Sequence, residues 1–302
     1  MGGGESIHDL RKAAVRRRGI RVTPSATRAA SAVPPAIRAF DRLADQYDAL
    51  CAGDIMTMMR RRTHERMARR FPPGSRILEI GCGTGLDTGF LASMGAHVVA
   101  ADPSARMLDR TRARLRATNN MAHLIRCGAE ELDQHLGPAT FEGIVSNFGA
   151  LNCVEDLGQV ASLARDRLVP GGWVMLGLLT RTCAWEIARG LLRGRPREAF
   201  RRLGVRPMID LDGIEVPAYY HRVGDVLAVF GASFVVGRAE GLGVFVPPSR
   251  CEDRWRRLPS AVRRAACRTE ASLGPWFPFN RLGDYVFLEL HRDSRRSGAG
   301  RA

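Results

Sequence analysis

Five short apolar runs alternate with helical segments between positions 76 and 179, and this alternation constrains the fold more than any other feature. The segments expected to be helices are 86–94, 104–117, 131–136 and about 155–168. Strands and helices alternating at this spacing predict βαβ units, and therefore an α/β fold with a doubly wound parallel sheet. The runs expected to be strands are RILEI (76–80), HVVAAD (97–102), AHLIRC (122–127), FEGIVSN (141–147) and WVMLGLL (173–179).

The rest of the chain divides by composition into two tails and one domain. Residues 1–36 are rich in arginine and serine and poor in acids, which predicts a disordered basic tail. This tail resembles a transit peptide, or is an arginine cluster without function. A single domain is expected over 37–292, with further helices at 37–50, 54–70 and 220–232 and strands at 233–246 and 283–290. Residues 293–302 are expected to form a second disordered tail.

Residues 182–218 interrupt the alternation and are rich in arginine, with Gly and Pro interspersed. This composition predicts an insertion that forms a helical cap over the edge of the sheet. An amphipathic basic cap admits an apolar substrate with an acidic group, docks on a membrane surface, or is only a solvated lid.

The formal net charge is +15, but the composition argues against a nucleic-acid partner. All but one of the 46 basic residues are arginine, the exception being Lys12, which is typical of a GC-rich genome. The charge is also spread along the chain, whereas nucleic-acid binders concentrate it on one face. No apolar run approaches the roughly 18–20 residues that a transmembrane helix needs.

Seven cysteines, an odd number, include no C-x-x-C pair, which predicts free thiols in a reducing, cytoplasmic compartment. The seven histidines form no H-E-x-x-H cluster, so no metal site is expected.

A glycine-rich turn, LEIGCGTG (78–85), follows the first strand of the series. A dinucleotide-binding turn reads G-x-G-x-x-G, which requires glycine at position 86, where this chain has Leu86. The tighter spacing of Gly81, Gly83 and Gly85 lets the backbone pass beneath an uncharged or zwitterionic nucleoside. A Cβ atom at position 81 or 83 would occupy that space.

The segments ILEIGCGTG and VVAADPSARML resemble motif I and its sequel in the class I S-adenosylmethionine (SAM) methyltransferases. The resemblance covers about 37–292 and implies SAM as cofactor. It also implies a seven-stranded, mostly parallel Rossmann-like sheet, in which 233–246 and 283–290 are the last two strands.

The resemblance implies cofactor roles for residues around the turn. Glu79 and the three glycines would form the wall against the methionine part of SAM. Asp102 would accept both ribose hydroxyls, or is only the N-cap of the following helix. Met107 would pack on the adenine. Tyr47 matches a position where the N-terminal helix folds over SAM, or its ring only packs.

Gly128 follows the third strand, at a position where many relatives carry an aspartate that contacts the adenine amine. The backbone N–H of Ala129 would reach the ring, and Glu130 would replace the missing carboxylate. Alternatively, Glu130 belongs only to the charged first turn of a helix.

The segment SNFGALNCV (146–154) ends the fourth strand and lacks the Asn/Asp-Pro-Pro-Tyr element of enzymes that methylate base or amide nitrogen. Its form favours a small-molecule acceptor. Phe148 would press on the methyl donor, with Asn147 beside it. Asn147 and Asn152 would orient the acceptor, or satisfy loop backbone.

Candidate residues for the acceptor pocket follow the fifth strand. His221 is the first candidate for a general base because histidine titrates near neutrality, although a lone histidine is often structural. Glu186 is a second candidate. Trp185, Tyr219 and Tyr220 are expected to line the pocket.

Together these features predict a SAM-dependent methyltransferase of a small, apolar metabolite of natural-product, quinone or lipid type, acting on oxygen or carbon. The alternatives are a nucleic-acid methyltransferase that uses the basic tail, an NAD(P)-dependent oxidoreductase, and a SAM-binding protein without catalysis.

Overall fold

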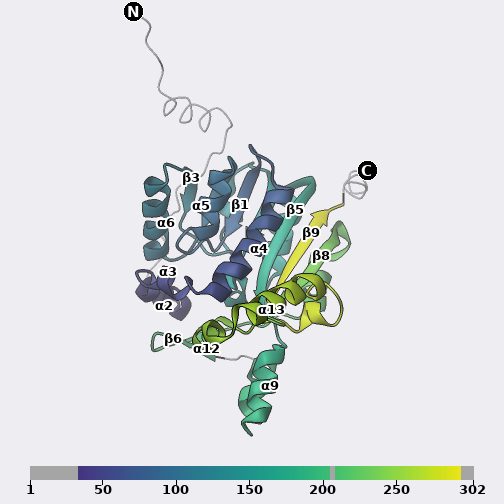
Figure 1. Cartoon of the computed structure of the whole chain (residues 1–302). Coiled ribbons are helices and arrows are strands. Elements are labelled where there is room, and N and C mark those ends of the chain that lie inside the picture. Colours follow the sequence, from purple (N-terminus) through teal and green to yellow (C-terminus); the bar gives the residue numbers. More distant parts are fainter. Residues whose placement is uncertain (1–32, 205–207, 294–302) are drawn as a thin grey trace, which may run out of the picture.

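The computed structural model of this chain describes residues 33–204 and 208–293 (Figure 1). The tails predicted over 1–36 and 293–302 fall almost entirely outside these residues.

The described residues form a seven-stranded sheet of order β3-β2-β1-β4-β5-β9-β8. Strands β1 to β5 are parallel, and β9 runs antiparallel to both of its neighbours, β5 and β8. This arrangement confirms the predicted seven-stranded, mostly parallel α/β fold. The strands are β1 (Arg76–Ile80), β2 (His97–Ala101), β3 (Ala122–Ile125), β4 (Phe141–Ser146), β5 (Leu168–Leu179), β8 (Phe234–Leu242) and β9 (Tyr285–Arg292).

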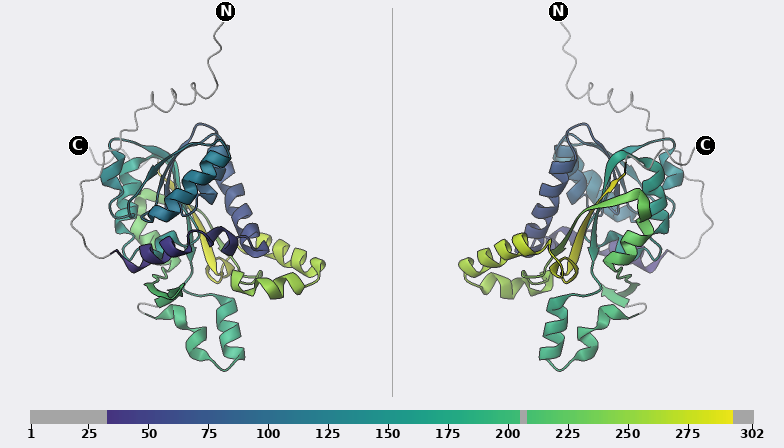
Figure 2. Two further views of the ribbon diagram at one scale, coloured as in Figure 1. Left: turned by 90° about the vertical axis from the view of Figure 1, so that its left-hand side faces the viewer. Right: turned by 90° about the vertical axis from the view of Figure 1, so that its right-hand side faces the viewer.

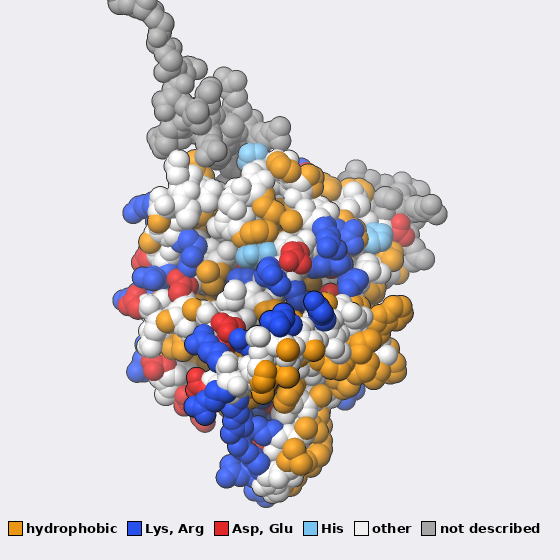
Figure 3. All heavy atoms as spheres, in the orientation of Figure 1, with side chains coloured by type: hydrophobic (Ala, Val, Ile, Leu, Met, Phe, Trp, Pro, Cys, Tyr) orange, Lys and Arg blue, Asp and Glu red, His pale blue; other side chains and the backbone are white. Residues whose placement is uncertain are grey.

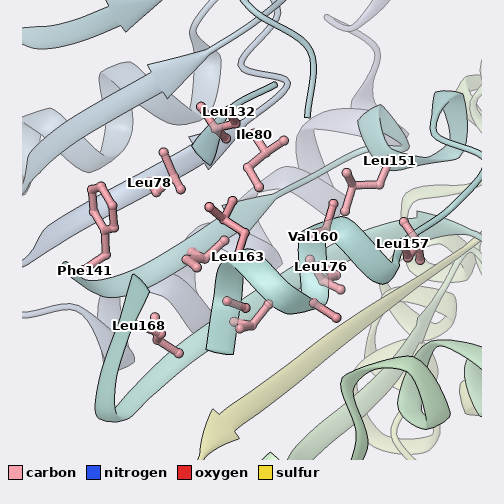
Figure 4. Packing of buried hydrophobic residues seen from close by; sticks show 14 of the residues in the cluster. Leu78, Ile80, Leu132, Phe141, Leu151, Leu157, Val160, Leu163, Leu168 and Leu176 are labelled. Atoms are coloured by element: carbon pink, nitrogen blue, oxygen red, sulfur yellow. The ribbon is translucent and has the colours of Figure 1, made fainter. Parts of the chain in front are cut away.

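Helices cover both faces of the sheet, and successive strand residues point to opposite faces. In β5, Val174 and Leu176 pack into one core and Met175 into the other. The first core includes α7 (Asp133–Leu136), α8 (Gly158–Arg167) and α11 (Val223–Phe230), and Figure 4 shows its leucine-rich packing. The second includes α4 (Asp54–Arg70), α5 (Leu86–Ser93), α6 (Ala105–Ala117), α12 (Glu252–Arg257) and α13 (Ser260–Leu273).

Two strand ends differ most from the expectation. Strand β5 begins at Leu168 instead of residue 173. Its pairing with β4 shifts register between Phe141 and Gly143, and this shift accommodates residues 169–172. Strand β8 ends at Leu242 instead of residue 246. Gly243 has a positive φ of 78°, and the buried Glu270 accepts hydrogen bonds from the four backbone N–H groups of 243–246, so this segment leaves the sheet.

The segment 182–218 follows an inner strand, since the outer strands of the sheet are β3 and β8. It starts beyond the carboxyl end of the inner strand β5 and contains α9 (Ala184–Leu192), α10 (Pro196–Ala199) and a hairpin of β6 (Met208–Leu211) and β7 (Ile214–Pro217). Strand β7 packs against α2 (Pro35–Leu43), which is followed by α3 (Tyr47–Leu50). The α9–α10 pair projects from the body of the molecule (Figure 2).

Within the described ranges, none of the helices combines the length and the apolar character needed to cross a bilayer.

Candidate active site

The glycine turn connects β1 to α5 with all three glycines at positive φ, namely 74°, 55° and 78° for Gly81, Gly83 and Gly85. A Cβ atom at position 83 would have no neighbour within 4 Å, so the backbone there faces open space. A Cβ atom at position 81 would instead lie 2.3 Å from the Cβ atom of Ala150. The expectation for Gly81 is therefore corrected: its glycine lets the turn pack against the loop after β4, and only Gly83 keeps space open.

Asp102 follows β2 and lies beside this open space. Its Oδ2 accepts the backbone N–H of Gly83 at 2.8 Å, and its Oδ1 accepts that of Ser104 at 2.9 Å. The N-cap of α6 is Ser104, whose Oγ accepts the N–H of Met107 at 3.1 Å, so Asp102 is not the cap. Burial raises the pKa of Asp102 to about 6, against the lowering effect of the two backbone hydrogen bonds.

Glu79 is buried beneath the turn. Its carboxylate accepts a hydrogen bond from the hydroxyl of Thr88 at 2.6 Å. Burial and the nearby charge of Asp87 raise the pKa of Glu79 to about 8. The group is therefore largely protonated at neutral pH.

A buried network around Asp87 was not predicted from the sequence. Asp87 accepts hydrogen bonds from Arg60 at 2.5 Å and from Asn147 at 2.9 Å, and its oxygen lies 2.7 Å from the His64 ring nitrogen. Burial opposes ionisation of Asp87, but Arg60 and His64 outweigh it and lower its pKa below the usual range. The sequence shows an acid in the first turn of α5 and a run of arginines in α4. No local pattern indicates that these two helices bring them into contact.

Asn147 works inside this network and not toward an acceptor. Its Nδ2 also donates to the hydroxyl of Thr63 at 3.1 Å, and its Oδ1 accepts the backbone N–H of Phe148 at 3.0 Å. These bonds hold Phe148, which has a positive φ of 48°, at the end of β4. The Arg60 guanidinium lies 4.3 Å from the centre of the Phe148 ring.

Tyr285 is an aromatic residue of this site that the sequence analysis missed. Its ring contacts Phe148 edge to face, with 5.6 Å between the ring centres. Tyr47, from α3, contacts Phe40 at 6.3 Å. Burial raises the pKa of both phenols well above the usual range, so both stay protonated at neutral pH. The signal for Tyr285 was an aromatic directly after a Gly-Asp turn at the start of the last strand.

The remaining predicted cofactor residues lie at the ends of β2 and β3. Met107 is buried in α6. Ala129 is partly buried and packs against the first core. Glu130 is exposed, and its Oε2 lies 2.7 Å from where a Cβ atom at Gly128 would be. The missing side chain at 128 thus gives room to the carboxylate of Glu130.

Asn152 has a different task from the one expected. Its Nδ2 donates to the carbonyls of Leu179 at 3.2 Å and Tyr219 at 2.7 Å, and its Oδ1 accepts the N–H of Leu179 at 2.8 Å. These bonds tie the loop after β4 to the end of β5 and to the segment before α11. The structure therefore does not direct Asn152 to an acceptor.

The other predicted acceptor residues are spread over neighbouring loops. Trp185 donates its Nε1–H to the carbonyl of Val244 at 2.8 Å, and the Tyr219 hydroxyl lies 3.1 Å from Glu155. The Tyr220 ring lies beneath Arg202, whose guanidinium carbon is 5.1 Å from the ring centre.

His221 lines a cavity of about 450 Å³ together with residues from the end of β5 and the start of α11. Its Nε2 lies 3.2 Å from the carbonyl of Val154. Burial lowers its pKa, so the ring is neutral at pH 7. The contacts recorded for His221 within the described residues do not include Phe148 or the glycine turn.

Glu186 is not a general base, because three arginines surround its carboxylate. Arg201 donates to it at 2.8 Å, Arg202 at 2.7 Å and Arg250 at 2.5 Å. Burial opposes ionisation, but these hydrogen bonds outweigh it and lower the pKa of Glu186 below its usual range. Cys183, Glu186 and Asp284 place possible metal ligands within 4.8 Å of one another, yet Arg202 donates to both carboxylates there.

Comparisons with known proteins identify the family. A protein-family model described as a methyltransferase domain matches residues 77–172. A ubiquinone biosynthesis O-methyltransferase of Rhizobium rhizogenes is 31% identical over 189 residues, which cover 60% of this chain and 67% of that protein. The chain belongs to the class I SAM-dependent methyltransferase family.

Other relatives match over shorter segments. A demethylmenaquinone methyltransferase of Clavibacter sepedonicus is 36% identical over 103 residues, covering 34% of this chain and 40% of the relative. A ubiquinone biosynthesis O-methyltransferase of Rhizobium etli is 33% identical over 129 residues, which cover 41% of this chain and 51% of the relative. The chain thus spans about half the length of these two relatives or less.

Solved structures agree in fold at low identity. A SAM-dependent methyltransferase from Clostridium acetobutylicum has a TM-score of 0.55 at 13% identity, covering 84% of this chain and 99% of that one. The [4+2]-cyclase SpnF has a TM-score of 0.56 at 15% identity, and the match covers 91% of this chain and 98% of that one. These likenesses concern the fold alone.

Proposed function

We propose that this protein transfers a methyl group from SAM to an oxygen or carbon atom of a small, apolar acceptor, with quinols as the first class to test. The observation that carries the proposal is the open space at Gly83 beside the Asp102 carboxylate, at the carboxyl ends of β1 and β2. Ligands of open α/β sheets bind at this edge.

The residues at this edge suit SAM. Each Asp102 oxygen accepts one backbone hydrogen bond, so lone pairs remain for two ribose hydroxyls. Gly83 leaves room for close backbone approach. Phe148 and Tyr285 offer an apolar, aromatic wall beside the turn.

SAM supplies an electrophilic methyl group on a good leaving group, so the protein's contribution is chiefly orientation and exclusion of water. The Phe148 ring contacts the Tyr285 phenol, which stays protonated, and the Arg60 cation. Neither accepts a proton at neutral pH. This favours an acceptor that is nucleophilic without a protein base, such as the electron-rich ring carbon of a hydroquinone or a phenol acidic enough to ionise near neutral pH.

The names of the relatives support the acceptor class, since they act in ubiquinone biosynthesis or on demethylmenaquinone. A nucleic-acid acceptor remains the second candidate because of the formal net charge of +15. The family match argues against the oxidoreductase alternative.

The test uses SAM labelled on its methyl group, incubated with the protein and an extract of its source cells. We expect label in the organic-soluble fraction, and transfer to a reduced quinone when one is supplied alone. Label in the nucleic-acid or protein fraction would contradict the proposed acceptor. SAM binding without transfer to any fraction would favour a non-catalytic protein.

A matched pair of glycine variants tests the site itself. Gly83 and Gly171 both have positive φ, 55° and 77°, and a Cβ atom at either would have no neighbour within 4 Å. Replacing either with alanine costs roughly 1 kcal/mol of stability through backbone strain. We expect Gly83→Ala to weaken SAM binding about tenfold or more in calorimetry, whereas Gly171→Ala binds normally. Equal affinities for the two variants would remove Gly83 from the site.

A further inference from the structure

The connection between α9 and α10 consists only of exposed residues. We call residues 191–198 the hairpin tip; every residue of this segment is exposed. The tip includes Leu191, which is 52% exposed, and Leu192, which is 89% exposed. The two leucines end α9, and their exposed apolar area is unfavourable in water unless a further surface covers it.

The hairpin holds the tip away from the body of the molecule (Figure 2). Helices α9 and α10 pack closely on each other, since a Cβ atom at Gly190 would lie 2.6 Å from the Cβ atom of Ala199. The base of the hairpin is bound to the sheet, because buried Arg202 donates to both Glu186 of α9 and Asp284 before β9. The tip is therefore a convex, supported projection.

Positive charge accompanies the leucines. The tip carries Arg193, Arg195 and Arg197, and only Arg195 has an acidic partner among the described residues, Glu198 at 3.0 Å. Figure 3 shows arginine side chains on one side of the projection and apolar side chains on the other.

A second exposed apolar pair lies in the connection between α13 and β9. Trp276 is 68% exposed and Phe277 is 73% exposed. This connection adjoins the base of the hairpin, where the Ala184 N–H donates to the carbonyl of Leu282 at 2.9 Å. The Arg281 guanidinium lies 5.6 Å from the Phe277 ring centre. Apolar and cationic groups thus occur together at both places.

We propose that the hairpin tip docks on the surface of an anionic lipid bilayer, with Leu191 and Leu192 in the interface and the arginines on headgroup phosphates. Interfacial segments combine exposed apolar side chains with basic ones in this way. A bilayer accommodates a convex projection, whereas a protein partner needs a matching groove. A second tip would bring like charges together. The inference does not rest on the proposed methyl transfer.

The experiment is co-sedimentation of the full chain with vesicles of phosphatidylcholine alone or mixed with phosphatidylglycerol. We expect Leu191→Ser/Leu192→Ser to lower the partition coefficient on the mixed vesicles about tenfold or more. This variant keeps every charge, so any attraction from other basic segments is unchanged. The control is Val235→Ser/Val236→Ser, an adjacent exposed pair on β8 at the opposite end of the sheet from β5's exit to α9. The control is expected to bind like the wild type.

A charge variant distinguishes binding to anionic lipid from non-specific apolar adsorption to any vesicle. Arg193→Gln/Arg197→Gln should lower binding to anionic vesicles several-fold, with no effect on phosphatidylcholine vesicles. Arg69→Gln/Arg116→Gln is the control, since both side chains are exposed and outside the ion pairs of the described chain.

Two outcomes would overturn the proposal. The first is vesicle binding by the leucine variant that equals binding by the wild type, because the tip then makes no contact with the bilayer. Binding of RNA in place of vesicles, lowered by the arginine variant and not by the leucine variant, would assign the tip to nucleic acid. Methyl transfer to a soluble acceptor should be unchanged in the leucine variant, so failure here is separate from failure of the proposed activity.

Discussion

Burial raises the pKa of the Asp102 carboxyl to about 6, because its two backbone hydrogen bonds offset only part of the cost of burying the charge. No cation pairs with its carboxylate among the described residues; its recorded partners are two backbone N–H groups. In the absence of ligand, the raised pKa means that the contribution of Asp102 to folding stability is lost as pH rises through about 6.

The pH dependence of SAM binding should report this group. Ribose hydroxyls donate to the ionised carboxylate, so affinity is expected to fall about tenfold between pH 7.5 and pH 5. Asp102→Asn should bind SAM more weakly at pH 7.5 and lose this pH dependence. Calorimetric titrations at several pH values measure both effects, and an unchanged pH profile in the variant would show that another group titrates.

The site residues that could not be predicted from the sequence are those whose partners lie far away in the chain. Asp87 contacts Arg60 and Asn147, which lie 27 and 60 positions away in the chain. Asn152 was expected at the acceptor, yet its amide bonds to backbone at Leu179 and Tyr219. An asparagine can either bind a substrate or satisfy loop backbone. The groups that surround its amide in the folded protein decide between these two roles.

At the scale of elements, Arg202 joins α9 to the sheet. It donates to the Glu186 carboxylate at 2.7 Å, to the carboxylate of Asp284, and to the carbonyl of Thr180 at the end of β5 at 3.1 Å. One buried guanidinium thus connects three segments that are far apart in sequence.

Removal of this guanidinium should be strongly destabilising. Arg202→Met leaves Asp284 buried without its cation, and we expect a loss of about 3 kcal/mol in the free energy of unfolding. The control Arg195→Met removes an exposed ion pair with Glu198 and should cost less than about 1 kcal/mol. Urea unfolding measures both, and equal small losses would mean that Arg202 does not hold the hairpin.

The β6–β7 hairpin was absent from the sequence expectation although a signal was present. Asp212 and Gly213 have positive φ values of 55° and 75°, as the tight turn between the strands requires. An Asp-Gly pair between alternating apolar residues is a strong hairpin signal. The arginine-rich surroundings of 182–218 directed the interpretation toward a helical cap.

Across the whole molecule, the seven cysteines are all unpaired. A disulfide typically contributes 2–4 kcal/mol, so its reduction would shift the melting temperature by several degrees. We expect thermal unfolding to be the same with and without a reducing agent, within about 1 °C by calorimetry. A clearly lower melting temperature in the reductant would reveal a disulfide.

The sequence by itself determined the class of fold, the order of alternating strands and helices, and the glycine turn with its following aspartate. These features follow from apolar periodicity and turn chemistry, which act between residues close in the chain. Only the tertiary structure decided that Gly83 and not Gly81 faces open space, that Asn147 and Asn152 serve the fold, and that Tyr285 joins Phe148. These outcomes depend on contacts between distant segments, and such contacts exist only once the sheet has brought the strand ends together.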